Sequence, residues 1–294
     1  MPAVLTAGAY TGPSDRRTLD RVIVVALLTG DVTGAAIDDS DESRVAQLAS
    51  DVGVVLYEAR MLVAAGYPAI VATTADAARA YELAAKLYAH GGDAVACDAG
   101  EVVSSEAMVE LDKFTLDERG VTAGKESLEW SDVLCLLRAT HRARTATETK
   151  TTERKFSASR SLLSGGLSNT TTVTKHLKDS SESREQVLYV FRRSQQTPWI
   201  LREQGTHYEG LGAGLARTTV ENFATTTRIL RERASDAVYD ERLVTRARVA
   251  ERAVRQGTSA QSIITSSSAS GVDVLAHLLA LSIARERRTN PLRR

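Results

Sequence analysis

The chain has 294 residues, of which 43% are hydrophobic and 25% are charged, and this composition excludes an intrinsically disordered protein. Lysine and arginine together number 37, and so do aspartate and glutamate, which gives a net charge of zero. The charges are unevenly distributed. Residues 1–100 carry 7 basic and 13 acidic side chains, whereas the remainder carries 30 and 24. A polyanion is therefore expected to avoid the first part and to be attracted to the second.

The N-terminal residues and the cysteines indicate the cellular compartment of the protein. Residues 1–19 are expected to form a flexible lead, and they lack the basic segment and apolar stretch of a signal peptide. The longest apolar run has 7 residues, against about 20 for a membrane span. Two cysteines, Cys97 and Cys135, are too few for a disulfide framework. We expect a cytoplasmic protein with buried free thiols and no membrane span.

Residues 20–100 predict a small domain with the order β-α-α-β-α-β. A short β-branched run at 21–28 indicates a buried strand, and Asp41 is expected to cap the first helix. A second helix should end at Gly66, before a strand at 69–74. Thr74 is expected to cap the third helix, whose apolar side chains repeat at i, i+3, i+4, i+7 and i+8, and a strand at 93–97 follows. We expect this region to fold alone, as three helices on one face of a three-stranded sheet.

This region resembles the C-terminal domain of the bacterial ribosomal stalk protein and, more loosely, the Clp protease adaptor that shares its fold. The resemblance rests on the family's glycine before a Leu-x-Glu-Ala-Lys helix, its proline at the middle strand and its glycine before the last strand, which match Gly53, Leu56, Glu58, Ala59, Arg60, Pro68 and Gly91. The stalk domain recruits translation factors through basic side chains. Here Tyr57 stands where the family has a lysine, so the resemblance implies a protein-docking domain without the ribosomal role.

Residues 105–235 have a β-rich texture, ending in an amphipathic helix. Strands are expected within 108–120 and 126–142, and a hairpin is expected from 185–193 and 198–203. The closing helix should use Val220, Phe223, Thr227 and Leu230. This order resembles bacterial pleckstrin-homology-like domains, which implies a barrel, although a split barrel of another type would give a similar pattern.

Residues 236–294 predict a helical tail. One helix is expected to present Leu243, Ala247, Ala250 and Val254 on one face, followed by a serine-rich linker over 256–271. A strongly apolar helix over 272–288 should bury four side chains against protein, either in this chain or in a partner: Leu275, Leu278, Leu279 and Ile283. The fold class is thus α+β: the small domain, a barrel-like β-rich domain and C-terminal helices.

No arrangement of residues predicts catalysis, and neither a cofactor nor a metal is expected. The glycines of 210–216 lack the spacing and the βαβ context of a dinucleotide loop, so a turn is the simpler interpretation. The five histidines have no zinc-ligand spacing. One cluster could bind phosphate groups, with a local charge of +5 between residues 138 and 160: Arg138, Arg142, Arg144, Lys150, Arg154, Lys155 and Arg160. A solvated strand face is the competing interpretation.

Three classes of function follow from these observations. The first is a non-enzymatic adaptor or regulatory protein that binds another protein, whose identity and oligomeric state the sequence leaves open. The second is a module that binds phosphate or anionic lipid through the basic cluster. An enzyme ranks third. Nucleic acid is disfavoured as a ligand because Phe156 is the lone aromatic residue within the basic cluster.

Overall fold

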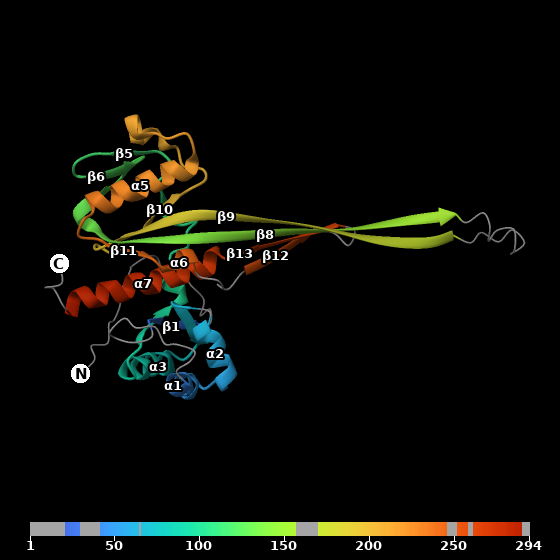
Figure 1. Cartoon of the computed structure of the whole chain (residues 1–294), viewed down its shortest axis with the longest axis horizontal. Coiled ribbons are helices and arrows are strands. Elements are labelled where there is room, and N and C mark those ends of the chain that lie inside the picture. The colour runs from blue at the N-terminus through green and yellow to red at the C-terminus, as the bar shows by residue number, and fades with distance from the viewer. Residues whose placement is uncertain are drawn as a thin grey trace, which may run out of the picture.

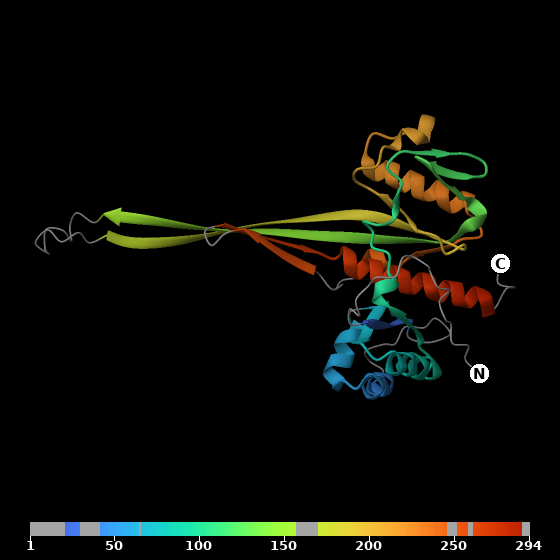
Figure 2. The same cartoon turned by 180° about the vertical axis from the view of Figure 1, so that it is seen from behind.

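The computed structural model describes residues 21–29, 42–64, 66–156, 170–245, 252–257 and 261–289. Within these ranges, only the backbone is described at 146–156, 170–179, 252–257 and 261–265. The fold is α+β, as predicted. The helices and sheets form stacked layers, and a long hairpin projects sideways from them (Figure 1). Seen from behind, the same hairpin extends well past every other element (Figure 2).

The N-terminal part contains the predicted β-α-α-β-α-β order. Strand β1 lies in the centre of a three-stranded sheet and runs antiparallel to both neighbours, in the order β2-β1-β3. Thr74 does not cap the third helix; the cap is Asp76, whose Oδ1 accepts the backbone N–H of Arg79 at 3.1 Å. The elements are β1 (Ile23–Thr29), α1 (Glu42–Val52), α2 (Leu56–Ala64), β2 (Ala69–Thr74), α3 (Ala77–Ala89) and β3 (Asp93–Asp98).

Both faces of β1 are buried, each against a different partner. Successive side chains of a strand point to opposite faces, so Val25 and Leu27 pack with the helices α1 to α3. Val24 and Leu28 pack instead with helix α7 (Ala269–Thr289), from the other end of the chain. The second face of this sheet is therefore covered by a C-terminal helix, which the sequence-based prediction of an isolated layer did not include.

The β-rich part is an open sheet built on two very long strands. Strand β8 (Val133–Phe156) pairs antiparallel with β9 (Thr170–Arg192) along its whole length. The sheet order is β12-β13-β8-β9-β10-β4, and β11 pairs parallel to β8. The other strands are β4 (Val109–Glu110), β10 (Trp199–Arg202), β11 (Val238–Glu241), β12 (Arg252–Gly257) and β13 (Gln261–Ser267).

A small second sheet and a helix cover the face of β8 and β9 that is turned away from α7. The small sheet has the order β5-β6-β7, with β5 (Phe114–Leu116), β6 (Gly120–Ala123) and β7 (Glu126–Glu129). Helix α5 (Thr219–Arg233) buries Phe223 and Leu230 in the same cluster, whereas Val220 is 53% exposed and does not belong to the buried face as predicted. The glycine-rich segment forms a short 3-10 turn, η3 (Tyr208–Gly214), where Gly212 has a φ of 53°.

Three sequence-based predictions for the C-terminal two thirds were wrong. Across the described residues the sheet does not close into a barrel, because its long strands continue outward as a hairpin instead of curling back. The described part of the helix expected after residue 241 is α6 (Arg242–Thr245), Ala247 and Ala250 lie outside the described residues, and Val254 lies in a strand. The expected linker contains β13, which pairs with β8 from Gln261↔Thr149 to Ser267↔Ala143. This distant partner supplies the hydrogen bonds that override the local serine-rich pattern.

Candidate functional site

The projecting part of the β8–β9 hairpin, residues 142–156 and 170–184, is here called the arm. At about 3.3 Å per residue, its 15-residue strands are about 50 Å long. Strand β13 borders β8 as far as Thr149, and beyond this point β8 and β9 are the two strands of the arm among the described residues. A free two-stranded hairpin is only marginally stable in water, so a projecting ribbon of this length gains most from a partner.

One edge of the arm has no neighbouring strand over most of its length. Strand β10 pairs with β9 from Val187 to Val190, and the backbone N–H of Glu203 donates to the carbonyl of Gln186 at 2.9 Å. Among the described residues, no strand pairs with β9 on this side between Thr170 and Glu185. Here this stretch is called the open edge. It has no proline, so every residue keeps its N–H donor.

A buried group of polar side chains fixes the base of the arm. Tyr189 on β9 donates its hydroxyl to Oδ1 of Asp273 on α7 at 2.6 Å, and Nε2 of His141 on β8 lies 2.6 Å from the same hydroxyl. Oδ2 of Asp273 accepts the backbone N–H of Ser105 at 2.9 Å. Both strands of the hairpin, the helix α7 and the segment after β3 are thus joined at one point.

Burial governs the protonation of this group. His141, Tyr189 and Asp273 are 7%, 0% and 3% exposed. Burial lowers the pKa of His141 to about 4 and raises the pKa of Asp273, and it raises that of Tyr189 well above its usual value. Because the Tyr189 hydroxyl donates its only hydrogen to Asp273, neutral His141 must donate from Nε2 to the tyrosine oxygen. His141 is therefore neutral, and the Tyr189 hydroxyl donates one hydrogen bond and accepts another.

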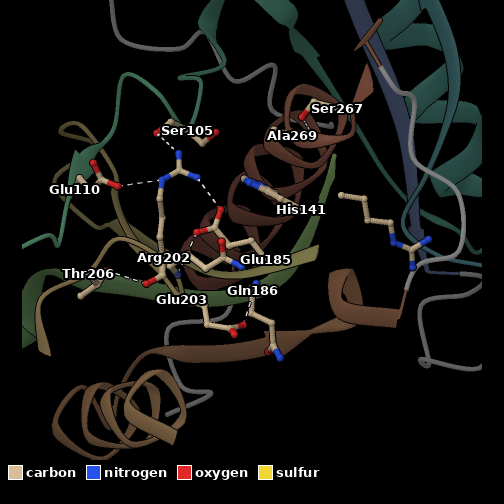
Figure 3. A network of polar contacts seen from close by, with 12 residues as sticks. Ser105, Glu110, His141, Glu185, Gln186, Arg202, Glu203, Thr206, Ser267 and Ala269 are labelled. Atoms are coloured by element: carbon tan, nitrogen blue, oxygen red, sulfur yellow. Dashed lines mark hydrogen bonds and ion pairs between the residues drawn. The ribbon is translucent and has the colours of Figure 1, made fainter. Parts of the chain in front are cut away.

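Arg202 links this buried group to the surface, next to Glu185 at the end of the open edge that adjoins the body (Figure 3). Its guanidinium donates to the carbonyl of Ser105 at 3.3 Å and lies 3.1 Å from Glu110 and 3.5 Å from Glu185. Oε1 of Glu185 also accepts the backbone N–H of Gln204 at 3.2 Å. These contacts hold β9 at Glu185 against β10 and β4, so the arm leaves the body in a fixed direction.

The contacts of this buried group join separate elements of the fold. A histidine, a tyrosine and an aspartate that are hydrogen-bonded one after the other could relay a proton, but all three are buried where α7 packs on the sheet. The sequence analysis did not select Tyr189, Asp273 or Arg202. The aspartate gave a signal that could have been used, since it is an acidic residue within an apolar helical run, and such a residue must be paired when buried.

The basic cluster predicted from the sequence is not assembled into one site among the described side chains. Arg138 donates from Nε to Gln186 at 2.8 Å and lies over the ring of Phe223, so it belongs to the body. Arg142 is half-buried and has a polar partner, and Arg144 is exposed at the base of the arm. The side chains of the other four basic residues lie outside the described part of the chain: Lys150, Arg154, Lys155 and Arg160.

The four apolar side chains predicted to meet protein lie in the core of this same chain. Leu275, Leu278 and Leu279 are 1%, 0% and 1% exposed, and Ile283 is 8% exposed. They pack between the N-terminal sheet and the sheet of β8 and β9. The predicted helix is confirmed, and the alternative left open by the sequence is decided in favour of packing within the chain. These residues are not available to a partner.

Apolar side chains are instead exposed on α2 and at Val55, just before it. Tyr57 and Val55 are 70% and 64% exposed, and Leu56 and Met61 are each 38% exposed. The helix buries Ala59 and Val63 alone among its described residues. Its outward face is therefore more apolar than a surface helix requires, which is typical of a contact surface.

A depression of about 500 Å³ lies between β7 and the end of β9, but its charges are already paired. Asp132 accepts Nε of Arg192 at 2.8 Å and the backbone N–H of Ser194 at 2.8 Å. Arg193 donates to the carbonyl of Val133 at 3.1 Å. An anion would have to displace these contacts, so the depression is a poor anion site.

Comparisons with protein-family profiles, with curated proteins and with solved structures found no match to this chain. The resemblance of residues 20–100 to the ribosomal stalk domain and that of residues 105–235 to pleckstrin-homology-like domains therefore stay predictions. Within the described residues, no helix has the length and apolar character needed to cross a bilayer.

Proposed function

We propose that this chain is a non-enzymatic protein-binding module whose binding element is the open edge of the arm. The observation that carries the proposal is the row of backbone groups on β9 from Thr170 to Glu185, which has no neighbouring strand among the described residues. An exposed strand edge is a template for strand addition by another polypeptide. The body then acts as a support that aims the arm.

The direction of the free hydrogen-bonding groups follows from the contacts at the base of the arm. The carbonyl of Gln186 accepts from Glu203, on the side away from β8. In an antiparallel strand, the backbone N–H and C=O groups of successive residues face opposite edges. Those of the even-numbered residues of β9 therefore face away from β8, and those of the odd-numbered residues bond to β8. The N–H groups of Glu182 and Arg184 therefore face the open edge.

The exposed side chains near this edge favour a specific partner over general aggregation. From Ser180 to Arg184 every residue is exposed, and the segment contains Glu182 and Arg184, which form an ion pair at 3.0 Å. Charged residues on an edge oppose random strand pairing. Main-chain hydrogen bonds would then supply affinity, and the order of charges would select the partner.

One substitution separates strand addition from other modes of binding. Glu182→Pro removes an outward N–H while leaving the β8–β9 ladder intact, since proline is tolerated where the N–H faces solvent. Glu182→Ala is the matched control, because it loses the same side chain and keeps the N–H. In an extract of the source cells, the tagged wild type and Glu182→Ala should elute in a complex, and Glu182→Pro should elute free.

Two results would contradict the proposal. One is elution of the wild type at the mass of the single chain. The other is a complex that both variants retain, which would place the binding surface elsewhere, for instance on α2.

A further inference from the structure

The two faces of the arm differ in charge where the arm leaves the body. On β9, the side chain of Tyr189 points toward α7 and that of Leu188 toward α5, and successive residues continue this alternation. Residues directly opposite each other on β8 and β9 share a face. The face that continues from Leu188 is here called the arginine face, and its residues are Arg142, Arg144, Glu182 and Arg184. The other face of the same stretch is uncharged: Ala143, Thr145, Ser181 and Ser183.

The arginine face has an excess of positive charge. Arg142 lies directly opposite Arg184, and like charges in this arrangement destabilise a pair of strands. Because the backbone groups of Arg184 face the open edge, the two arginines form a non-hydrogen-bonded pair, in which the Cα atoms approach to about 4.5 Å and the side chains are closest. The carboxylate of Glu182 lies 3.0 Å from Nε of Arg184, and Glu182 is also opposite Arg144. Three arginines and one glutamate give this face a formal charge of +2.

The outer side of the arginine face lies along the open edge. The segment that begins as β10 borders β9 as far as Gln186, and it then turns at Gly205, which has a φ of 90°. The side chains of Arg184 and Glu182 are 64% and 49% exposed. A strand added to this edge would therefore place its own side chains directly beside Arg184, on the side away from Arg142.

We infer that the segment that adds to the open edge is an extended acidic polypeptide, with an acidic side chain directly across from Arg184. This inference rests on the proposed function and names the chemistry of the partner. The acidic side chain gives Arg184 an opposite charge on its outer side, where Arg142 is a like charge on its inner side. A basic segment would instead add a further positive charge to the row. The alternate residues of the partner lie beside Ser181 and Ser183, so they need no charge.

The first test measures the binding of labelled synthetic peptides to the purified full-length chain by fluorescence anisotropy at low salt. One nine-residue peptide alternates threonine with glutamate, and its matched control alternates threonine with lysine. The glutamate peptide should bind with a dissociation constant about tenfold lower than that of the lysine peptide. A third peptide alternates proline with glutamate, which keeps the charge but removes N–H donors, and it should bind weakly. Equal binding of the glutamate and lysine peptides, or a preference for lysine, would overturn the inference.

A charge reversal at Arg184 tests the position of the contact. Arg184→Glu should reverse the preference, so that the lysine peptide binds more tightly than the glutamate peptide. The variant should fold, because it replaces the like-charge pair with Arg142 by a pair of opposite charges. Arg217→Glu is the matched control: it changes the net charge by the same amount at an exposed position before α5, and it should keep the wild-type preference. Equal effects of the two substitutions would show that net charge, and not the arginine face, selects the peptide.

These measurements separate the two proposals. If the glutamate and lysine peptides bind equally and Glu182→Pro abolishes both, the acidic partner is refuted and strand addition is kept. If the wild type binds neither peptide, the acidic partner is refuted, and the complex in extract alone decides on strand addition. If the proline–glutamate peptide binds as tightly as the threonine–glutamate peptide, and Glu182→Pro changes neither, both proposals are refuted. The arginine face would then attract flexible polyanions or anionic surfaces without strand addition.

Discussion

Tyr189 and Asp273 join the base of the arm to helix α7 through a hydrogen bond of 2.6 Å that is buried from solvent. The two residues are 84 positions apart in the sequence, and the bond connects β9 to the first turns of the last helix. Through α7 it also connects to the N-terminal sheet, because Nη1 of Arg285 donates to the carbonyl of Ala94 at 3.1 Å. The orientation of the arm therefore depends on a contact outside the arm itself.

Removing the tyrosine hydroxyl should weaken this junction. Tyr189→Phe leaves Asp273 without one donor and His141 without its acceptor, and a buried hydrogen bond to a charged group contributes about 1.5–3 kcal/mol. We expect a loss of that size in the free energy of unfolding, measured in urea. Tyr239→Phe is the control, because its bond to Glu241 is exposed and should be worth less than about 0.5 kcal/mol. Equal effects of the two substitutions would contradict a special role for the buried bond.

Stability should fall in mild acid because of His141. Its folded-state pKa is about 4, below the value of 6.5 expected for an unfolded chain. As the pH falls below 6.5, the unfolded chain binds a proton that the folded chain does not bind until about pH 4. The free energy of unfolding therefore decreases across this range, by at most about 3 kcal/mol from this residue.

His141→Gln should flatten that dependence. Asp273 has a raised pKa and acts in the opposite direction, since the folded chain holds its proton at higher pH than the unfolded chain. The quantity to compare is thus the slope of unfolding free energy against pH, in the wild type and in the variant. Identical slopes between pH 4 and 6.5 would show that His141 is not buried in its neutral form.

The N-terminal region could be predicted from its sequence more completely than the rest. Its helices end at Gly53, Gly66 and Gly91, which have φ values of 78°, 81° and 91°, so local chemistry defines the boundaries. The β12–β13 pair is different, because β13 is defined by pairing with β8, more than 100 positions earlier, and β12 is defined by pairing with β13. The arm posed the same problem: its charges were compatible with a solvated strand face, but they did not predict a strand of 24 residues.

The sites were predicted less well, for two physical reasons. A charge cluster in a sequence does not reveal which side chains are already paired, and Arg138 turned out to contact Gln186 and Phe223. An open edge is a property of backbone groups, which every residue has, so composition does not reveal it. The buried position of Leu278 was predictable from helical spacing, whereas the identity of the covering surface required the fold.

The N-terminal region should not stay soluble alone. The sequence favours an independent unit, but a fragment of residues 21–100 would expose the sheet face that α7 covers, including Val24 and Leu28. Contiguous apolar surface of this kind promotes association. We expect the fragment to aggregate in light scattering, and we expect Val24→Ser with Leu28→Ser to reduce aggregation. A monodisperse, helical wild-type fragment would support the sequence-based prediction instead.

Any binding of anionic surfaces should use the basic cluster predicted from the sequence. Replacing Arg154, Lys155 and Arg160 by alanine should abolish co-sedimentation with anionic vesicles at low salt, because it removes three of the seven positive charges of the basic cluster. Arg138→Ala is the informative contrast. Its guanidinium is engaged with Gln186, so this variant should lose stability and keep vesicle binding. Physiological salt should weaken binding, since the Debye length there is about 8 Å. A wild type that fails to sediment at low salt would show that the basic cluster is only a solvated strand face.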